Sequence, residues 1–243
     1  MSRRTIWSNA GRIAACVTVG ASLGVCIPAA WAGDVGSEVT PDVAANIQVR
    51  TSGFLFKEIP LDKTSARAGE GQTVTMGEHA IALQGQEIKV GDTLRAATLQ
   101  DPAMQGVAIA GQSGRVRILS VVPSLLTPTC EQQTHYLSEK SAGLSERVEL
   151  VTISLDTPEV QKKFAKEAEI ENVSFLSDAS EAEFGRAHGL LIEKPRMLTR
   201  AVLVVDADGV VRYLQVVPEV SHMPDMESVF DFARTLAGEE PAG

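Results

Sequence analysis

The stretch PSLLTPTC, residues 123–130, places a proline, a threonine and a cysteine at a spacing that could build a reactive thiol. The apolar run before it, residues 115–122, is typical of a buried strand, and the polar segment after Cys130 is typical of a helix. Cys130 is therefore predicted in the first turn of a helix that follows a strand. The partial positive charge and free N–H groups of a helix N-terminus favour the thiolate, which is the nucleophilic form of cysteine.

Two further features would help such a thiolate. The Thr127 hydroxyl stands about one helical turn before Cys130 and could donate a hydrogen bond to the sulfur. A nearby arginine would add a positive charge that it cannot lose. The alternative from the residues alone is that Cys130 is a buried, inert thiol that serves only in packing.

The first 32 residues predict a secretory signal peptide. They hold three arginines and no acidic residue, followed by an apolar run that ends in Ala30-Trp31-Ala32, an A-x-A cleavage pattern. The alternative is a retained membrane anchor, but the run is short for a spanning helix and is interrupted by two glycines and a proline. We expect a protein exported to the periplasm, with a mature chain that begins at Gly33.

Removal of this segment changes the charge and the cysteine count. The whole chain has 22 basic and 31 acidic residues; without the three arginines of the signal, 19 basic residues face 31 acidic ones, a net charge of −12. This net negative charge argues against nucleic acid and anionic membranes as partners. Cys16 and Cys26 leave with the signal, so that Cys130 becomes the only cysteine, and a single thiol in an exported protein is a candidate reactive group.

The order of predicted elements indicates an α/β fold of the thioredoxin-like type: a mixed central sheet flanked by helices, with an N-terminal β-hairpin. Residues 33–71 are interpreted as a linker or N-terminal extension with a short docked element, residues 72–238 as the domain, and residues 239–243 as a tail. Strands are expected at 115–122, 148–156, 173–178, 200–206 and 210–217, helices at 129–144, 157–170, 179–189 and 223–238, and a hairpin at 73–83.

The chain resembles a known family at these residues. P-x-x-x-T-x-x-C matches the active-site motif of the peroxiredoxins, and PSLLTPTC is similar to the pattern of one branch, the bacterial thiol peroxidases of the atypical two-cysteine type. The segment TRAVLVVDADG is similar to the branch's strand that opens with a basic residue, which places that residue at Arg200. The resemblance covers roughly residues 72 to 237.

The resemblance implies roles for five residues. Cys130 would be the peroxidatic cysteine, which attacks a hydroperoxide and becomes a sulfenic acid. Thr127 would orient the thiolate and the peroxide, and Pro123 would shield the pocket from water. Arg200 would stabilise the thiolate and the charge that develops as the O–O bond breaks. The backbone N–H groups of Thr129 and Cys130 would hold peroxide oxygens.

Each role has a structural alternative. Pro123 could merely end the strand, Thr127 could act only as the helix cap, and Arg200 could pair with an acid such as Asp206 or Glu219. On function, the alternatives to an enzyme are a redox sensor with little turnover and a thioredoxin-like binding module.

The chain departs from the branch at the second cysteine. The resolving cysteine of the branch lies in the helix after the next strand, where this chain reads Lys163-Phe164-Ala165. In a mature chain with no second thiol, we expect the sulfenic acid to be reduced by an external thiol, from a protein or a small molecule; the alternative is that the Cys130 residues of two chains join. The resemblance also implies a homodimer.

No cofactor or metal is predicted. The four histidines show no metal-ligand spacing, and His135, five residues after Cys130, is expected on the surface. The chain has no C-x-x-C, which excludes a thioredoxin-type disulfide exchanger.

Overall fold

The computed structural model describes residues 48–49, 53–141, 144 and 148–238. The chain divides into the units 1–40 and 41–243, and all described residues belong to the second. The predicted signal peptide, the start of the extension and the tail 239–243 lie outside the described residues. Within the described part, no helix is both long and apolar enough to span a bilayer.

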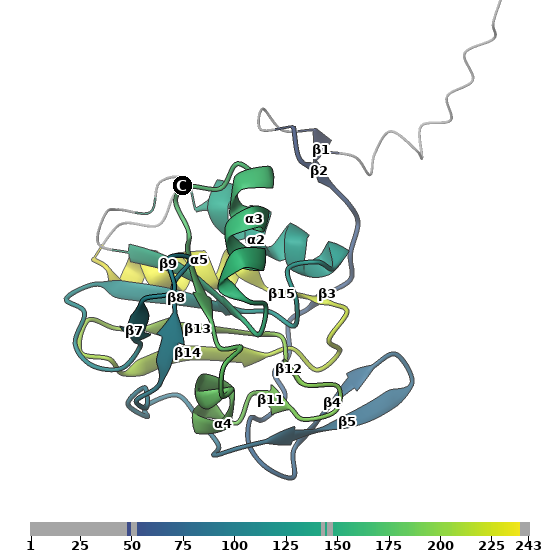
Figure 1. Ribbon diagram of the computed structural model, residues 1–243, viewed down its shortest axis with the longest axis vertical. Coiled ribbons are helices and arrows are strands. Elements are labelled where there is room, and N and C mark those ends of the chain that lie inside the picture. Colours follow the sequence, from purple (N-terminus) through teal and green to yellow (C-terminus); the bar gives the residue numbers. More distant parts are fainter. Residues whose placement is uncertain (1–47, 50–52, 142–143, 145–147, 239–243) are drawn as a thin grey trace, which may run out of the picture. The chain divides into compact units, whose positions relative to one another are not determined.

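Among the described residues, seven strands form a mixed sheet (Figure 1). The strand that precedes the cysteine motif lies in the interior of the sheet, and every residue of that strand is buried. It pairs in parallel with the next strand and antiparallel with the strand that follows Arg200. In spatial order the strands are β14 (Val211–Val216), β13 (Ala201–Val205), β8 (Val116–Val121), β9 (Val148–Ser154), β10 (Ser174–Ser177), β6 (Thr98–Gln100) and β7 (Gly106–Ala108).

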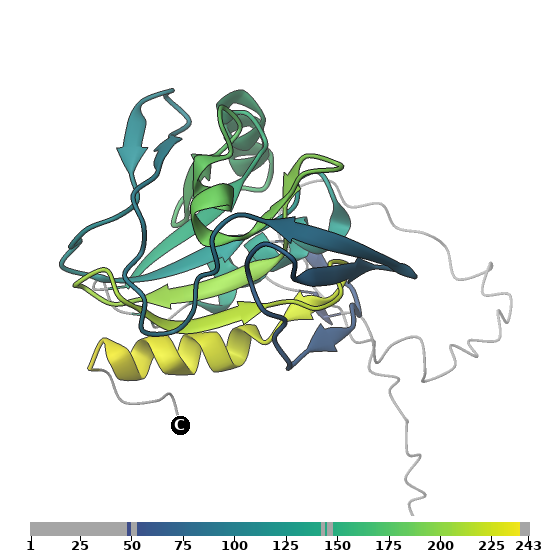
Figure 2. The ribbon, with the colours of Figure 1, turned by 90° about the horizontal axis from the view of Figure 1, so that it is seen from below.

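Helices cover both faces of this sheet, as the sequence predicted. Helices α2 (Pro128–Lys140), α3 (Pro158–Glu167) and α5 (Met226–Leu236) contribute to one apolar cluster, and Figure 2 shows α5, in yellow, lying along the sheet. Helix α4 (Glu183–His188) contributes to the cluster on the other face. The fold class is confirmed: the protein is a thioredoxin-like α/β domain.

Local sequence explains where these helices begin. Thr157 caps α3 by accepting a hydrogen bond from the Val160 N–H. Asp225 caps α5 in the same way at Ser228. The Asp178 carboxylate accepts from the N–H groups of the first turn of α4. Burial raises the pKa of Asp178 against the effect of those N–H bonds.

The predicted hairpin is confirmed. Strands β4 (Thr73–Met76) and β5 (His79–Gln84) pair antiparallel around a turn at Gly77-Glu78, where Gly77 takes the positive φ of 62° that the tight turn needs. Two short strands extend this sheet: β11 (Leu191–Ile192) pairs with β5, and β12 (Met197–Leu198) pairs with β11.

The segment 53–62 lies against the helix that carries Cys130. β1 (Gln48–Val49) and β2 (Leu55–Phe56) pair with each other. Directly after β2, the Lys57 backbone and the Gln132 side chain form two hydrogen bonds, of 2.7 and 2.8 Å. β3 (Leu61–Asp62) then pairs in parallel with β15 (Met223–Pro224). These contacts bind the described part of the extension to α2 and to the segment before α5.

The extension overturns one expectation about the helix surface. His135 was expected on the surface, but it is 5% exposed, because the Phe54 ring stacks on it at 3.8 Å. The helical angle between His135 and Cys130 could not reveal that an aromatic ring from 81 residues earlier in the chain covers His135.

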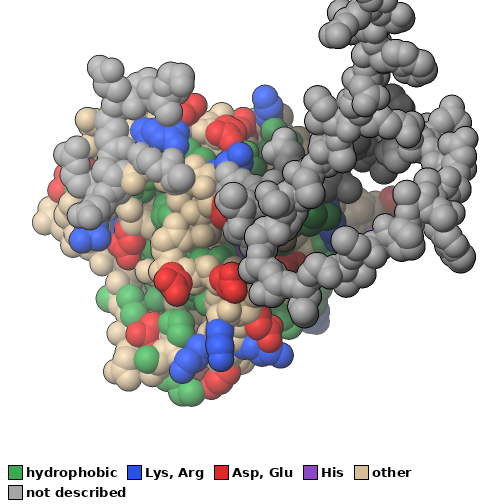
Figure 3. All heavy atoms as spheres, turned by 90° about the horizontal axis from the view of Figure 1, so that it is seen from above, with side chains coloured by type: hydrophobic (Ala, Val, Ile, Leu, Met, Phe, Trp, Pro, Cys, Tyr) green, Lys and Arg blue, Asp and Glu red, His purple; other side chains and the backbone are tan. Residues whose placement is uncertain are grey.

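Acidic and basic side chains are interspersed on the face of the molecule seen in Figure 3.

Candidate active site

Cys130 occupies the predicted position at the start of a helix. Thr127 is the N-cap of α2 and Pro128 opens the helix, so that Cys130 is its third residue. The first N–H groups of a helix have no partner within it. Those of Thr129 and Cys130 have no acceptor among the described residues. The Cys130 side chain itself is 0% exposed.

Arg200 makes a direct contact with the cysteine. Its Nη2 donates to Cys130 Sγ over 3.3 Å, its Nη1 donates to Gln133 Oε1 over 2.6 Å, and its Nε donates to the Val220 carbonyl over 2.8 Å. Two of these acceptors are uncharged oxygens. The third is the Cys130 sulfur, which becomes an anion when the thiol loses its proton. Since an unpaired buried charge is costly, a thiolate at Cys130 would satisfy the Arg200 guanidinium.

Neither of the expected acidic alternatives pairs with Arg200. Asp206 binds Arg212 at 2.6 Å; burial acts to raise the pKa of Asp206, but hydrogen bonds from Val210 and Arg212 hold it below its ordinary value. Glu219 accepts from the Thr75 hydroxyl at 2.6 Å.

Glu219 instead fixes the loop that contains Val220. It also accepts from the Ser221 hydroxyl at 2.7 Å and from the Gly77 N–H at 3.2 Å. Partial burial would raise the pKa of Glu219, but the hydrogen bonds from Thr75, Ser221 and Gly77 lower it to about 2. Glu219 thus joins the hairpin to the loop whose carbonyl holds Arg200.

Gln133 is a site residue that the sequence analysis did not identify. It is fully buried, three residues after Cys130, and it accepts from Arg200 while its own Nε2 donates to the Ser120 hydroxyl over 2.8 Å. Ser120 lies on β8. Gln133 therefore fixes the guanidinium relative to the central strand. The only signal in the sequence was its position one turn after the cysteine.

The loop before the helix is held by a residue of the next strand–helix connection. Asp156 accepts from the Ser124 hydroxyl at 2.8 Å and from the Leu125 N–H at 2.7 Å. Pro123 is buried at the end of the strand. Sequence reasoning also missed Asp156, whose role depends on the parallel pairing of β8 and β9.

Thr127 and Thr129 differ in part from their expected roles. The Thr127 side chain makes no capping hydrogen bond; its exposed hydroxyl donates to the Ser124 carbonyl at 3.0 Å. Thr127 is thus the N-cap residue through its backbone, and its hydroxyl donates to Ser124 and not to the Cys130 sulfur as expected. The hydroxyl oxygen keeps lone pairs for another donor. The Thr129 hydroxyl donates to the Ser221 carbonyl at 3.2 Å.

Ala165, where the family resemblance predicts the branch's second cysteine, lies on α3. It is half-buried and packs at the margin of the apolar cluster that contains Cys130. Within the described residues, Cys130 is the one free cysteine. No group of three or more metal-ligating side chains occurs in that same part of the chain.

A buried cysteine in the first turn of a helix, with an arginine on its sulfur and a thioredoxin-like sheet beneath it, defines the class of thiol-based redox proteins. The comparisons with known proteins narrow this class. The model of the Redoxin family matches residues 89–230, and the chain belongs to that family.

Its relatives identify the branch. A thiol peroxidase of Halalkalibacterium halodurans is 36% identical over 162 residues, 67% of this chain and 97% of the relative. The thiol peroxidase of Bacillus subtilis is 35% identical over 163 residues, with coverage of 67% and 97%. The chain is a peroxiredoxin of the thiol peroxidase branch, and its activity is that of a thiol-dependent peroxidase.

Solved structures similar to this chain are also peroxiredoxins or thiol peroxidases. A peroxiredoxin-like protein from Aquifex aeolicus has a TM-score of 0.64 at 34% identity, covering 68% of this chain and 96% of that one. A thiol peroxidase from Chromobacterium violaceum has a TM-score of 0.61, with coverage of 67% and 95%; at 18% identity it supports the fold alone.

Proposed function

We propose that the protein is an exported peroxidase that reduces hydrogen peroxide and organic hydroperoxides through Cys130 and an external thiol. The observation that carries the assignment of Cys130 is the hydrogen bond from Arg200 to its sulfur at the start of α2. The same guanidinium is placed to stabilise negative charge on sulfur before the reaction and on oxygen during it.

In the proposed reaction, the Cys130 thiolate attacks the terminal oxygen of the hydroperoxide. A sulfur–oxygen bond forms as the O–O bond breaks, and the leaving oxygen departs as an alcohol or water after it takes a proton. The Thr127 hydroxyl and the free N–H groups of Thr129 and Cys130 orient the peroxide. Arg200 stabilises the charge shared between the two oxygens.

Access to the sulfur requires a small movement. Cys130 is fully buried, while Leu126 and Thr127 directly before the helix are exposed, Leu126 to 73%. We propose that peroxide enters where these two residues shift, and that buried Pro123 keeps water from the sulfur. Buried Leu125 and Met226 share the apolar cluster of Cys130, which favours an approach by alkyl as well as hydrogen peroxides.

The reductant is proposed to be external. If residues 1–32 are removed, no second cysteine is left to condense with the sulfenic acid, and a thiol from a partner must attack its sulfur. N-terminal sequencing of protein from the cell envelope tests export: a start at Gly33 is expected, whereas an intact Met1 would contradict it.

The experiment on activity follows peroxide consumption with dithiothreitol as reductant. Wild-type protein is expected to consume hydrogen peroxide and cumene hydroperoxide with multiple turnovers, and Cys130→Ser is expected to consume neither. Oxidation of Cys130 without turnover would indicate a redox sensor and not an enzyme. Equal activity in wild type and Cys130→Ser would contradict the proposal.

A further inference from the structure

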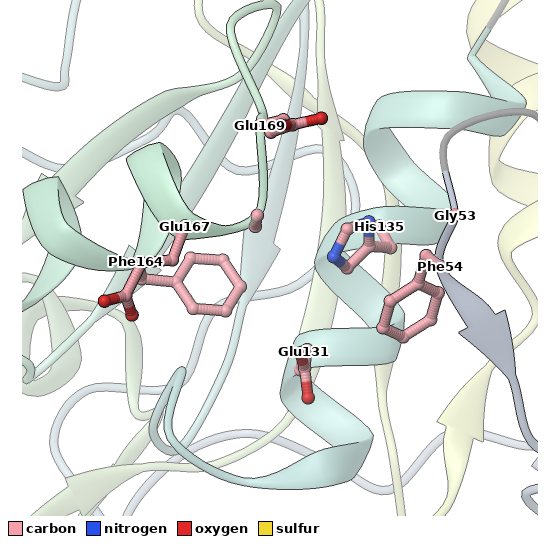
Figure 4. Close-up of a pocket in the computed structure, with 8 residues that line it drawn as sticks. Gly53, Phe54, Glu131, His135, Phe164, Glu167 and Glu169 are labelled. Carbon is pink, nitrogen blue, oxygen red and sulfur yellow. The ribbon is translucent and has the colours of Figure 1, made fainter. Parts of the chain in front are cut away.

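A pocket that the proposed reaction does not use lies between α2 and α3. Its volume is about 390 Å³, within the range of small-ligand sites. Figure 4 shows its walls: the two helices face each other, and Phe54 of the extension closes one side. The groups that give it chemical character are three carboxylates, one imidazole and two aromatic rings, from Glu131, Glu167, Glu169, His135, Phe54 and Phe164.

The imidazole of His135 is the buried polar group of this pocket. The side chain of His135 is 7% exposed, and its Nδ1 lies 3.1 Å from Glu139 Oε1. An ionised carboxylate can only accept, so Nδ1 carries the proton and, in the neutral ring, Nε2 keeps a lone pair. Nε2 has no hydrogen bond to any described residue, and Figure 4 shows the ring edge turned into the space between the helices.

The lining therefore offers acceptors of hydrogen bonds and negative charge. Neither lysine nor arginine is among the described residues that line the pocket. At its rim Glu167 pairs with Lys163 at 3.8 Å, and both side chains are largely exposed. The faces of Phe54 and Phe164 add surfaces that attract a cation on an apolar stem.

The backbone at Glu169 is unusual for its residue type. Glu169 has a φ of 54° just after the C-cap of α3, and the next N–H, of Ile170, bonds back to the Ala165 carbonyl at 3.0 Å. Glycine is the preferred residue at this position of a helix end. A glutamate there places a carboxylate at the rim of the pocket at a cost in backbone strain.

We propose that this pocket binds an organic cation, a primary ammonium or guanidinium group on an apolar stem. The ammonium donates to Nε2 of His135 and to the carboxylate of Glu169, while Glu131 adds negative charge at the opposite end of the pocket and the stem lies against the phenyl rings. This site is separate from the peroxide reaction, and its occupation does not depend on the proposed activity.

The test titrates the protein with butylammonium, with butanol as the neutral probe, by calorimetry and by amide chemical shifts. Wild-type protein is expected to bind one butylammonium, with shifts confined to α2, the end of α3 and residues 53–54, and to bind butanol at least about fivefold more weakly. Equal binding of the two probes, or shifts elsewhere, would overturn the proposal.

Two variants of one residue separate binding from folding. Glu169→Gln should weaken butylammonium binding about fivefold. Glu78→Gln, an equal charge change in the exposed hairpin turn, should leave it unchanged. Glu169→Gly should also weaken binding while raising the urea midpoint, because it relieves the positive φ. Unchanged binding in both Glu169 variants would overturn the proposal.

A lysine tripeptide distinguishes the sources of the cation. If acetyl-Gly-Lys-Gly-amide binds with the same shifts, the site accepts the side chain of a protein partner. If butylammonium alone binds, the ligand is a free amine. Either result supports the cation site, and failure of both probes would overturn it.

Discussion

Arg200 and Cys130, 70 residues apart in the chain, meet through a hydrogen bond of 3.3 Å from Nη2 to Sγ, with both side chains buried. The guanidinium finds no carboxylate among the described residues, since its other donors go to an amide oxygen and a backbone carbonyl. The anion that this arrangement accommodates is the thiolate of Cys130.

Substitution of the arginine tests this relationship. Arg200→Met should slow the reaction of Cys130 with hydrogen peroxide by about 10²-fold or more, because it removes a buried donor to the charge of the transition state. Stopped-flow kinetics measures the rate. Arg212→Met, which removes an exposed arginine bound to Asp206, is the matched control and should retain the wild-type rate. Similar rates in all three proteins would show that Arg200 has only a structural role.

Gln133 is predicted to act as a positioning residue. Gln133→Leu should slow the peroxide reaction about tenfold at neutral pH, because Arg200 loses the acceptor that fixes its orientation. The deficit should shrink as the pH rises, since hydroxide then supplies the thiolate without help from the guanidinium. A rate profile against pH measures both effects. A deficit of constant size at every pH would indicate general disruption of the fold.

His188 predicts a pH dependence of stability. Burial lowers the pKa of His188 to about 4, and the ring accepts from the Arg95 N–H at 3.0 Å through Nε2. The folded pKa lies below the unfolded value of 6.5, so protonation favours unfolding. This contribution is complete above pH 6.5 and is lost as pH falls through 4, an effect of about 3 kcal/mol.

Urea unfolding between pH 7.5 and pH 4 measures this dependence. His188→Asn should be less stable at neutral pH and should lose less stability on acidification than the wild type. His79→Gln, at an exposed histidine, should follow the wild-type curve. Parallel curves for His188→Asn and wild type would contradict the assignment.

The sequence predicted the parts of the site that depend on local pattern. The break from apolar strand to polar helix located Cys130 at a helix N-terminus, and the family resemblance located Arg200 directly before β13. Both predictions rest on residues that lie next to strongly apolar strands.

The residues that were missed act through contacts between distant segments. Asp156 holds the loop of Ser124 across 32 residues, and Phe54 buries His135 from a segment whose composition resembles a linker. A single polar residue in a loop carries no periodic signal, so neither contact could be derived from spacing. Burial of His135 in turn defines the pocket between α2 and α3.

Restoring a second thiol should change the product of oxidation. Ala165→Cys should form an internal disulfide with Cys130 after peroxide treatment, if the helix ends open locally, because Ala165 packs at the margin of the cluster around Cys130. Mass spectrometry under non-reducing conditions detects it. Lys163→Cys, exposed on the same helix, is the control and should not form it.

The most direct test of the account is the intact mass of wild-type protein, from Gly33 onward, after one equivalent of hydrogen peroxide. A gain of one oxygen atom on Cys130, reversed by a small thiol and raised to two by excess peroxide, is the predicted result. A covalent dimer through Cys130 as the main product would contradict the external-thiol route. An unchanged mass would contradict the role of Cys130 as the peroxide-reactive residue.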